Sequence, residues 1–245
     1  MSGHSKWSKV KHQKESTDAV KGKIFTKLAN AIIIAVKTGG GDDPASNFKL
    51  RLAIEKAKSF NMPKDNISRA IDRANKSASL SAMNEILYEA FGPYGVGILI
   101  KSATVNKQKT VSELKNILER NGGILAASGA VSHMFSQVGA IEIIKNDQNS
   151  EKILEKSVEI GALDYEDLLD RVIIYTNASE LHKVCEFIEK AGINIISADL
   201  FFKPTAQISI KKQQEIDKIN NLIAVIEERE DVTRVFSNYS FLLNV

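Results

Sequence analysis

One cysteine is present among the 245 residues of the chain, so no disulfide can form within it. This scarcity excludes the small secreted folds that depend on disulfides, and a reducing compartment, the cytoplasm, is expected. The most apolar run near the N-terminus, residues 29–36, is far too short to cross a bilayer. Residues 1–30 lack the apolar segment of a secretory signal, so the sequence predicts a cytoplasmic protein without a membrane partner.

Sequence signals of catalysis are missing as well. No phosphate-binding loop of the form Gly-x-x-x-x-Gly-Lys-Ser/Thr occurs in the chain. Gly92, Gly95 and Gly97 precede or enter a predicted strand, whereas a dinucleotide site needs its glycines after one. The four histidines lie far apart, without the spacing of metal ligands. We therefore expect neither an enzyme nor a bound cofactor, metal ion or small-molecule substrate.

The lone Cys185 is expected to be a core residue rather than a nucleophile. It shares one face of a predicted helix with Leu181, Val184 and Ile188. A buried cysteine usually behaves as a small apolar side chain, so the thiol adds no catalytic candidate.

The chain does have an uneven distribution of charge. Residues 1–76 hold 16 Lys and Arg against 7 Asp and Glu, which is a net charge of +9. Residues 136–202 hold 6 against 13, which is a net charge of −7. Such asymmetry predicts a basic module that meets a polyanion. The acidic segment either repels nucleic acid and so orients the protein on it, or is an ordinary solvated surface.

Three amphipathic helices are predicted in the basic segment. The first runs from a cap at residue 16 or 17 to residue 38, and the glycines at 39–41 end it because glycine readily adopts the left-handed conformation. Asp43 is expected to cap the second helix, with Pro44 at its first position. Pro63 opens the third helix, and residues 75–83 are predicted to be a linker. Short connections between such helices indicate a three-helix bundle.

The rest of the chain alternates strand and helix patterns. A strand–helix–strand pattern occurs at 96–103, 110–121 and 131–136, and again at 206–210, 213–229 and 232–238. Between them lies a strand–helix–strand–strand–helix–strand pattern at 140–145, 150–160, 166–169, 172–176, 179–191 and 194–202. This predicts a multidomain α + α/β protein, with an N-terminal three-helix bundle followed by two ferredoxin-like α+β domains, one inserted in the other. The expected domains are 1–76, the discontinuous pair 77–137 plus 203–245, and the inserted acidic 138–202.

The N-terminal tail interleaves lysines with one tryptophan and two histidines. Lysines supply positive charges for phosphates, and Trp7 can stack on a base. The alternative is a basic tail whose tryptophan is anchored in the core of the bundle. The candidate nucleic-acid-binding residues are Lys6, Trp7, Lys9, Lys11, His12, Lys14, Lys23, Lys27, Arg51 and Lys64.

Several motifs of the chain resemble the YebC/PmpR family. Those in the basic segment are Gly3-His4-Ser5-Lys6-Trp7, Lys11-His12, the stretch 22–28, the glycines at 39–41, Arg51-Leu52-Ala53-Ile54 with Lys56-Ala57, and Asn61-Met62-Pro63-Lys64-Asp65. Further matches are Tyr88-Glu89, Gly92-Pro93 and Thr110-Val111-Ser112-Glu113. The resemblance covers nearly the whole chain, and it implies three domains, cytoplasmic residence and nucleic-acid-linked regulation. Many members of the family are described as transcriptional regulators, whereas the similar mitochondrial translational activator of cytochrome c oxidase acts on translation at the ribosome.

Three classes of partner stay open on this basis. The first is duplex DNA, bound by a transcriptional regulator, and the second is structured ribosomal RNA, bound by a ribosome-associated translation factor. The basic residues are mostly Lys and no helix-turn-helix is evident, which favours contact with the backbone and shape of either nucleic acid. The third class is a protein partner of the acidic domain, without direct contact to nucleic acid. In each case we expect a monomer.

Overall fold

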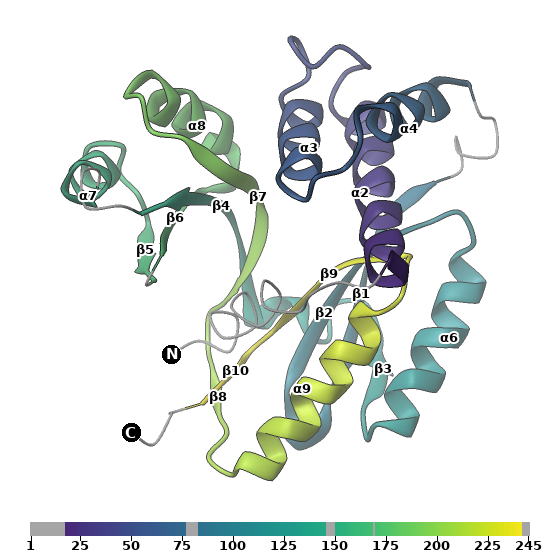
Figure 1. The fold of residues 1–245 in the computed structure, drawn as a ribbon. Helices are drawn as coiled ribbons and strands as arrows, with labels where there is room; N and C mark the ends of the chain where they lie inside the picture. The colour runs from purple at the N-terminus through teal and green to yellow at the C-terminus, as the bar shows by residue number, and fades with distance from the viewer. Residues whose placement is uncertain (1–17, 77–82, 146–149, 169, 242–245) are drawn as a thin grey trace.

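The computed structural model describes residues 18–76, 83–145, 150–168 and 170–241. Its first unit, the helical unit, consists of α2 (Asp18–Thr38), α3 (Phe48–Ser59) and α4 (Lys64–Lys76), which pack around one apolar core (Figure 1). Leu28 and Ile32 of α2 meet Leu50 of α3 and Ile67 of α4 in this core. The predicted three-helix arrangement is confirmed. The predicted cap of the first helix, at residue 16 or 17, lies outside the described residues.

The connection between α2 and α3 differs from the prediction. Neither Asp43 nor the proline after it belongs to α3, and the Asp43 carboxylate accepts a backbone N–H within the preceding turn, at 2.9 Å. The N-cap is Asn47, whose Oδ1 accepts the Leu50 N–H at 3.0 Å. Asn47 Nδ2 also donates to the carbonyls of Ala35 and Gly41, at 2.9 and 2.6 Å. An aspartate could not make all three bonds, because the amide of Asn47 both accepts from α3 and donates to the end of α2.

A four-stranded antiparallel sheet, the first sheet, follows in the order β3-β1-β2-β9. Its strands are β1 (Asn84–Phe91), β2 (Gly97–Thr104), β3 (Ile124–Ala126) and β9 (Val232–Ser237). Helices α6 (Lys107–Arg120) and α9 (Gln213–Glu227) cover one face and share an apolar core with it (Figure 1). A separate parallel pair of two-residue strands is formed by β8 (Ile208–Ser209) and β10 (Tyr239–Ser240).

The strands in and around the first sheet depart from the prediction at four places. One is β3, a three-residue strand that was not expected. β1 was not expected, because it lies between β2 and β3 with apolar side chains on both faces and therefore lacks a period of two. The predicted strand at 131–136 is the 3₁₀ turn η2 (Ser132–Met134) followed by the start of β4, which belongs to the second sheet. The predicted strand at 206–210 is reduced to β8, which pairs with β10 and not with the sheet.

The segment after β3 forms another four-stranded antiparallel sheet, the second sheet, in the order β5-β6-β4-β7. Its strands are β4 (Phe135–Ile144), β5 (Asp164–Asp167), β6 (Arg171–Asn177) and β7 (Ile195–Pro204). Helices α7 (Ser150–Glu159) and α8 (Leu181–Lys190) cover one face. This order of strands and helices is the one predicted for a ferredoxin-like unit.

The faces of the two sheets that carry no helices meet in an aromatic cluster. Leu99 and Phe236 of the first sheet contact Tyr175 and Phe201 of the second, and the rings of Phe201 and Phe236 are 5.2 Å apart and nearly perpendicular. The helical unit approaches β7 through α3, with Leu52 in the core of the second sheet (Figure 1). The chain is thus a mixed α+β protein, and its division into domains at residues 77, 138 and 203 stays a prediction.

Candidate nucleic-acid interface

The basic N-terminal segment is the candidate interface, and the structure places some of its predicted residues. Lys23, Lys27, Arg51 and Lys64 lie within the described part of the chain. The other predicted residues lie outside it, namely Lys6, Trp7, Lys9, Lys11, His12 and Lys14. Contact of the tail with nucleic acid, and the choice between stacking and anchoring for Trp7, therefore stay predictions.

Lys23 and Lys64 are exposed to solvent. Lys23 projects from α2, and Lys64 is the first residue of α4. Other exposed cations of the same three helices are Lys21, Lys49, Lys58, Arg69 and Arg73. Exposure leaves these groups accessible to phosphates, and together they give the helical unit a positive field.

The exposed side of α4 carries two arginines, Arg69 and Arg73, whose exposure the apolar stripe of this helix predicts but which are not among the ten candidate residues. Ile67 is buried in the core of the bundle, whereas Arg69 and Arg73 point to solvent. Arg69 is held by its own helix, because Nε donates to the Asp65 carbonyl at 3.1 Å and Nη2 donates to Asn66 Oδ1 at 2.5 Å. A guanidinium fixed in this way presents its planar group in a defined direction.

Lys27 differs from the exposed lysines because it lies at the contact between α2 and α9. Its ammonium donates to the backbone carbonyl of Glu227, the last residue of α9. Burial lowers the pKa of Lys27, although Glu227, Asp231 and Glu230 act in the opposite direction. A positive charge at the C-terminus of a helix also complements the helix dipole. Lys27 therefore holds α2 against α9, and a phosphate contact would compete with this bond.

Arg51 lies where α3 faces the second sheet and its helices. Its guanidinium is 5.3 Å from the centroid of the Phe48 ring, and the centroid of that ring is 4.2 Å from the centroid of the His182 ring on α8. The adjacent Leu52 is buried in the core of the second sheet. Arg51 is thus half-buried at an interface within the chain, and only part of its surface is open to a ligand.

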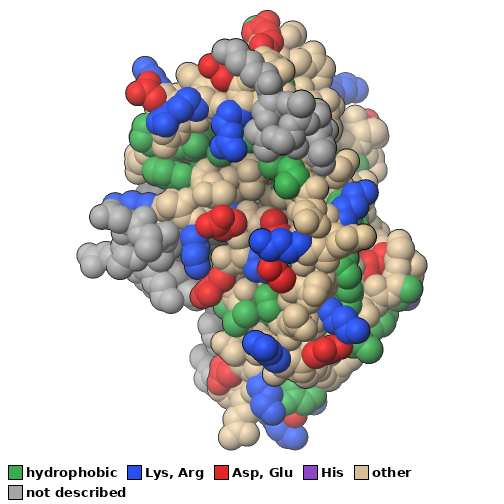
Figure 2. All heavy atoms as spheres, turned by 90° about the vertical axis from the view of Figure 1, so that its right-hand side faces the viewer, with side chains coloured by type: hydrophobic (Ala, Val, Ile, Leu, Met, Phe, Trp, Pro, Cys, Tyr) green, Lys and Arg blue, Asp and Glu red, His purple; other side chains and the backbone are tan. Residues whose placement is uncertain are grey.

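Charges of both signs are mixed on the face of the molecule shown in Figure 2. On this face, the Lys and Arg side chains of the described residues lie among Asp and Glu and form no unbroken basic patch. The electrostatic fields of neighbouring opposite charges largely cancel away from the surface. Salt screens what is left beyond the Debye length, which is about 10 Å at 0.1 M salt. Any phosphate contact made by this face is therefore short-ranged.

Cys185 is a core residue, as predicted. It is buried with Leu181, Val184 and Ile188. Burial and the nearby Glu189 raise the pKa of its thiol to about 12, so the thiol stays protonated near neutral pH. Within residues 18–76, 83–145, 150–168 and 170–241, no group of three or more His, Cys, Asp or Glu is placed to hold a metal ion. None of the helices in these ranges is long and apolar enough to span a membrane.

Comparison with protein families matches nearly the whole chain. Residues 5–77 match the family described as TACO1/YebC protein N-terminal domain. Residues 83–239 match the family described as TACO1/YebC second and third domain.

Similar proteins align with this chain along nearly their full length. A protein from Caldanaerobacter subterraneus, named as a "Probable transcriptional regulatory protein", is 43% identical over 239 residues, which are 97% of this chain and 98% of that protein. Another with this description, from Aquifex aeolicus, is 38% identical over 239 residues, which are 98% of this chain and 96% of that protein. The crystal structure of a conserved hypothetical protein from Aquifex aeolicus has a TM-score of 0.89 at 37% identity, and the match covers 98% of this chain and 99% of that one. The chain therefore belongs to the TACO1/YebC family, as its motifs predict.

Proposed function

We propose that this protein is a non-enzymatic regulator of transcription, which acts in the cytoplasm by binding duplex DNA through its basic N-terminal segment. Its relatives support a regulatory role, since both bacterial proteins compared above are named as transcriptional regulatory proteins and not as enzymes. The observation that carries the proposal is the charge of residues 1–76, with 16 Lys and Arg against 7 Asp and Glu. A polyanion is the natural partner of such a segment.

The contacts that we expect are with phosphates rather than with base edges. Residues 1–76 contain 13 Lys and 3 Arg, and lysine offers a mobile point charge without the planar fork that reads guanine. Exposed Lys23 and Lys64 extend the charge of the tail onto the helical unit. The acidic residues 136–202 repel phosphates, so we expect the basic segment to make the first contact with the nucleic acid. Contact through the backbone and shape of the duplex follows from this composition, and we expect the protein to bind as a monomer.

Replacing six lysines by Gln tests the proposal, at Lys6, Lys9, Lys11, Lys14, Lys23 and Lys64. Each phosphate contact releases about 0.7–0.9 counterion, so the variant should bind more weakly and with a clearly flatter slope of log K against log salt. The loss should be similar for many DNA sequences, because phosphates carry no base identity. Fluorescence anisotropy with a short labelled duplex measures both quantities. Lys27 is left in place because its ammonium also holds α2 on α9.

A matched control carries six Lys→Gln changes at exposed lysines outside the basic segment, at Lys107, Lys109, Lys115, Lys183, Lys211 and Lys212. It removes the same net charge and should keep most of the salt slope. If both variants bind with the same affinity and the same slope, the basic segment is not the binding surface. The acidic second sheet must then be tested for a protein partner.

Trp7→Ala separates stacking on a base from anchoring in the core. Loss of a stacked base weakens binding by about 1–3 kcal/mol and leaves the melting temperature unchanged. Loss of a core anchor lowers the melting temperature instead. The same titrations with a structured RNA decide the class of nucleic acid, because tighter binding to RNA at equal salt would redirect the proposal to a translation factor.

A further inference from the structure

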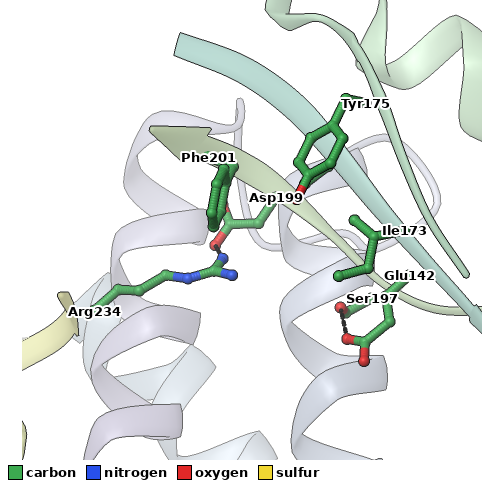
Figure 3. Close-up of a pocket in the computed structure, with 8 residues that line it drawn as sticks. Glu142, Ile173, Tyr175, Ser197, Asp199, Phe201 and Arg234 are labelled. Carbon is green, nitrogen blue, oxygen red and sulfur yellow. Dashed lines mark hydrogen bonds and ion pairs between the residues drawn. The ribbon is translucent and has the colours of Figure 1, made fainter. Parts of the chain in front are cut away.

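Asp199 of β7 lies in a cleft between the two sheets. Side chains of β4, β6, β7 and β9 line the cleft, among them Glu142, Ser197, Asp199 and Arg234 (Figure 3). Arg234 reaches across from the first sheet, with Nη1 3.6 Å from Asp199 Oδ2. This distance is compatible with an ion pair but is longer than an ordinary hydrogen bond. The contact between the two sheets at this point is therefore mainly electrostatic.

Two lysines from other elements add to the positive charge around Asp199. Burial acts to raise the pKa of Asp199, but Lys101 of β2, Lys56 of α3 and Arg234 outweigh burial and hold this pKa below its ordinary value. Lys101 Nζ also lies 3.0 Å from Glu85 Oε1 on the neighbouring strand β1. Lys101 is directly opposite Arg234 in the pairing of β2 with β9, so both side chains leave the same face of the first sheet, and α3, which carries Lys56, packs against β7.

Aromatic rings hold the guanidinium of Arg234 in place. Its central carbon is 5.1 Å from the centroid of the Phe201 ring and 5.4 Å from the centroid of the Phe236 ring. Contact with aromatic rings orients the planar group, and a guanidinium is weakly hydrated. An anion that binds Arg234 therefore has little water to displace and a fixed donor geometry to meet.

Glu142, the other carboxylate that lines the cleft, has partners on its own sheet. It accepts from Nη1 of Arg171 and, at 3.0 Å, from Oγ of Ser197. Its charge is therefore neutralised within the second sheet. Asp199, by contrast, has its ion pair across the cleft, with Arg234 of the first sheet.

We propose that Arg234, which lines this cleft, and the neighbouring Lys101 and Lys56 form a phosphate-binding site, and that Asp199 occupies the site as an internal competitor until a phosphate of nucleic acid displaces it. A phosphate diester carries the same single negative charge as the carboxylate and accepts paired hydrogen bonds from a guanidinium. The site holds the backbone of a nucleic acid that the N-terminal segment recruits. This inference rests on the proposed function and adds a second contact region, which the second sheet controls.

Asp199→Asn removes the competing charge and keeps the shape of the side chain. We expect this variant to bind a short labelled DNA duplex about three to ten times more tightly than wild type at equal salt, because the phosphate no longer has to displace a carboxylate. The slope of log K against log salt should stay similar, because both complexes make the same phosphate contacts. Adding Arg234→Gln to Asp199→Asn should flatten the slope by about 0.9, because it removes this phosphate contact. The melting temperature of each variant shows whether the fold is kept.

Asp164→Asn is the matched control for the change in net charge. Asp164 lies on β5 opposite Tyr175, on the same face of the second sheet, and pairs with Lys203 rather than with the three cations. Tighter binding that comes from net charge alone appears equally in both variants. Equal affinity of Asp199→Asn and Asp164→Asn would overturn the inference, and so would weaker binding by Asp199→Asn than by the control.

Isothermal titration with sodium tripolyphosphate tests the cleft without nucleic acid. Binding that is tighter for Asp199→Asn than for Asp164→Asn, and that Arg234→Gln abolishes, supports the site even if wild type binds no duplex. The absence of duplex binding would then count against the proposed function alone. Equal tripolyphosphate binding by the two variants, or none by either, shows that the cleft is not a phosphate site.

Discussion

Glu89 carries a buried charge that the backbone stabilises. Its side chain is 5% exposed, and its carboxylate accepts the N–H groups of Gly129, Val131 and Ser132 at 2.7, 2.6 and 2.9 Å. Burial acts to raise the pKa of Glu89, but these three donors outweigh burial and lower it from 4.5. The carboxylate thereby fixes the path of the chain from β3 into β4, at the junction of the two sheets.

Glu89→Gln should destabilise the fold by about 2 kcal/mol at pH 7, because hydrogen bonds to a charged group contribute about 1.5–3 kcal/mol. Since the folded pKa is lowered, the ionic contribution is complete above the ordinary value of 4.5 and is lost as the pH falls below it. Urea denaturation at pH 7 and at successively lower pH should show that the difference in free energy of unfolding between wild type and variant becomes smaller as the pH falls. Glu119→Gln, at an exposed residue, is the control and should change stability by less than about 0.5 kcal/mol. If this difference in the free energy of unfolding did not change with pH, the charge of Glu89 would not be what stabilises the fold.

At the level of elements, the connection between α2 and α3 shows whether Asn47 acts only as the N-cap of α3 or also through its hydrogen bonds to the Ala35 and Gly41 carbonyls. Asn47→Asp keeps the acceptor for Leu50 but turns the donor toward Ala35 and Gly41 into a second carboxylate oxygen. We expect a loss of about 2–3 kcal/mol, because two carbonyls lose their donor and a charge is buried. Asp43→Asn, in the exposed turn, should cost less than about 0.5 kcal/mol. Urea denaturation at pH 7 measures both, and full stability of Asn47→Asp would show that α3 requires only a cap acceptor.

Helices of this chain were more accessible to sequence reasoning than the strands of the first sheet. Leu28 and Ile32 lie at helical spacing on one buried stripe, so the local pattern alone indicates the helix. β1 carries apolar side chains on both faces, and no alternation marks it as a strand. Asp43 and Asn47 are equally good caps by residue type. The choice between them depends on carbonyls at the end of α2, which is a tertiary contact.

The same limit applies to the candidate site. Lys23 and Lys27 are one helical turn apart and look alike in the sequence, yet Lys23 is exposed and Lys27 bonds to Glu227 at the far end of the chain. The basic character of the first 76 residues follows from composition, whereas the partner of each lysine follows from the fold. Asp199 is one of many acidic residues in its segment, and only the fold brings it to Arg234.

At the scale of the whole molecule, the chain enters the second sheet and leaves it at neighbouring points, because β4 is its first strand and β7 its last. β4 and β7 pair in antiparallel fashion, with Ser136 opposite Lys203 and Gln137 opposite Phe202. The ends of the predicted inserted domain, 138–202, therefore lie side by side. Because Ser136 is opposite Lys203, Asn-Gly inserted between Gln137 and Lys203 closes the excised chain with a three-residue hairpin loop, Gln137-Asn-Gly, which ends on the glycine that such loops favour. The excised chain keeps the helical unit and every strand of the first sheet.

We expect the excised chain to fold in one cooperative transition, at lower stability than the full chain. Leu99 and Phe236 lose their cover by Tyr175 and Phe201, and full burial of such a side chain contributes about 1.5–3 kcal/mol. Circular dichroism followed through urea denaturation measures the transition. Phe236→Thr in the excised chain reduces the exposed apolar surface and so separates aggregation from unfolding. If neither excised form shows a cooperative transition, the first sheet does not close without the second, and the predicted division of the chain at residues 138 and 202 is wrong.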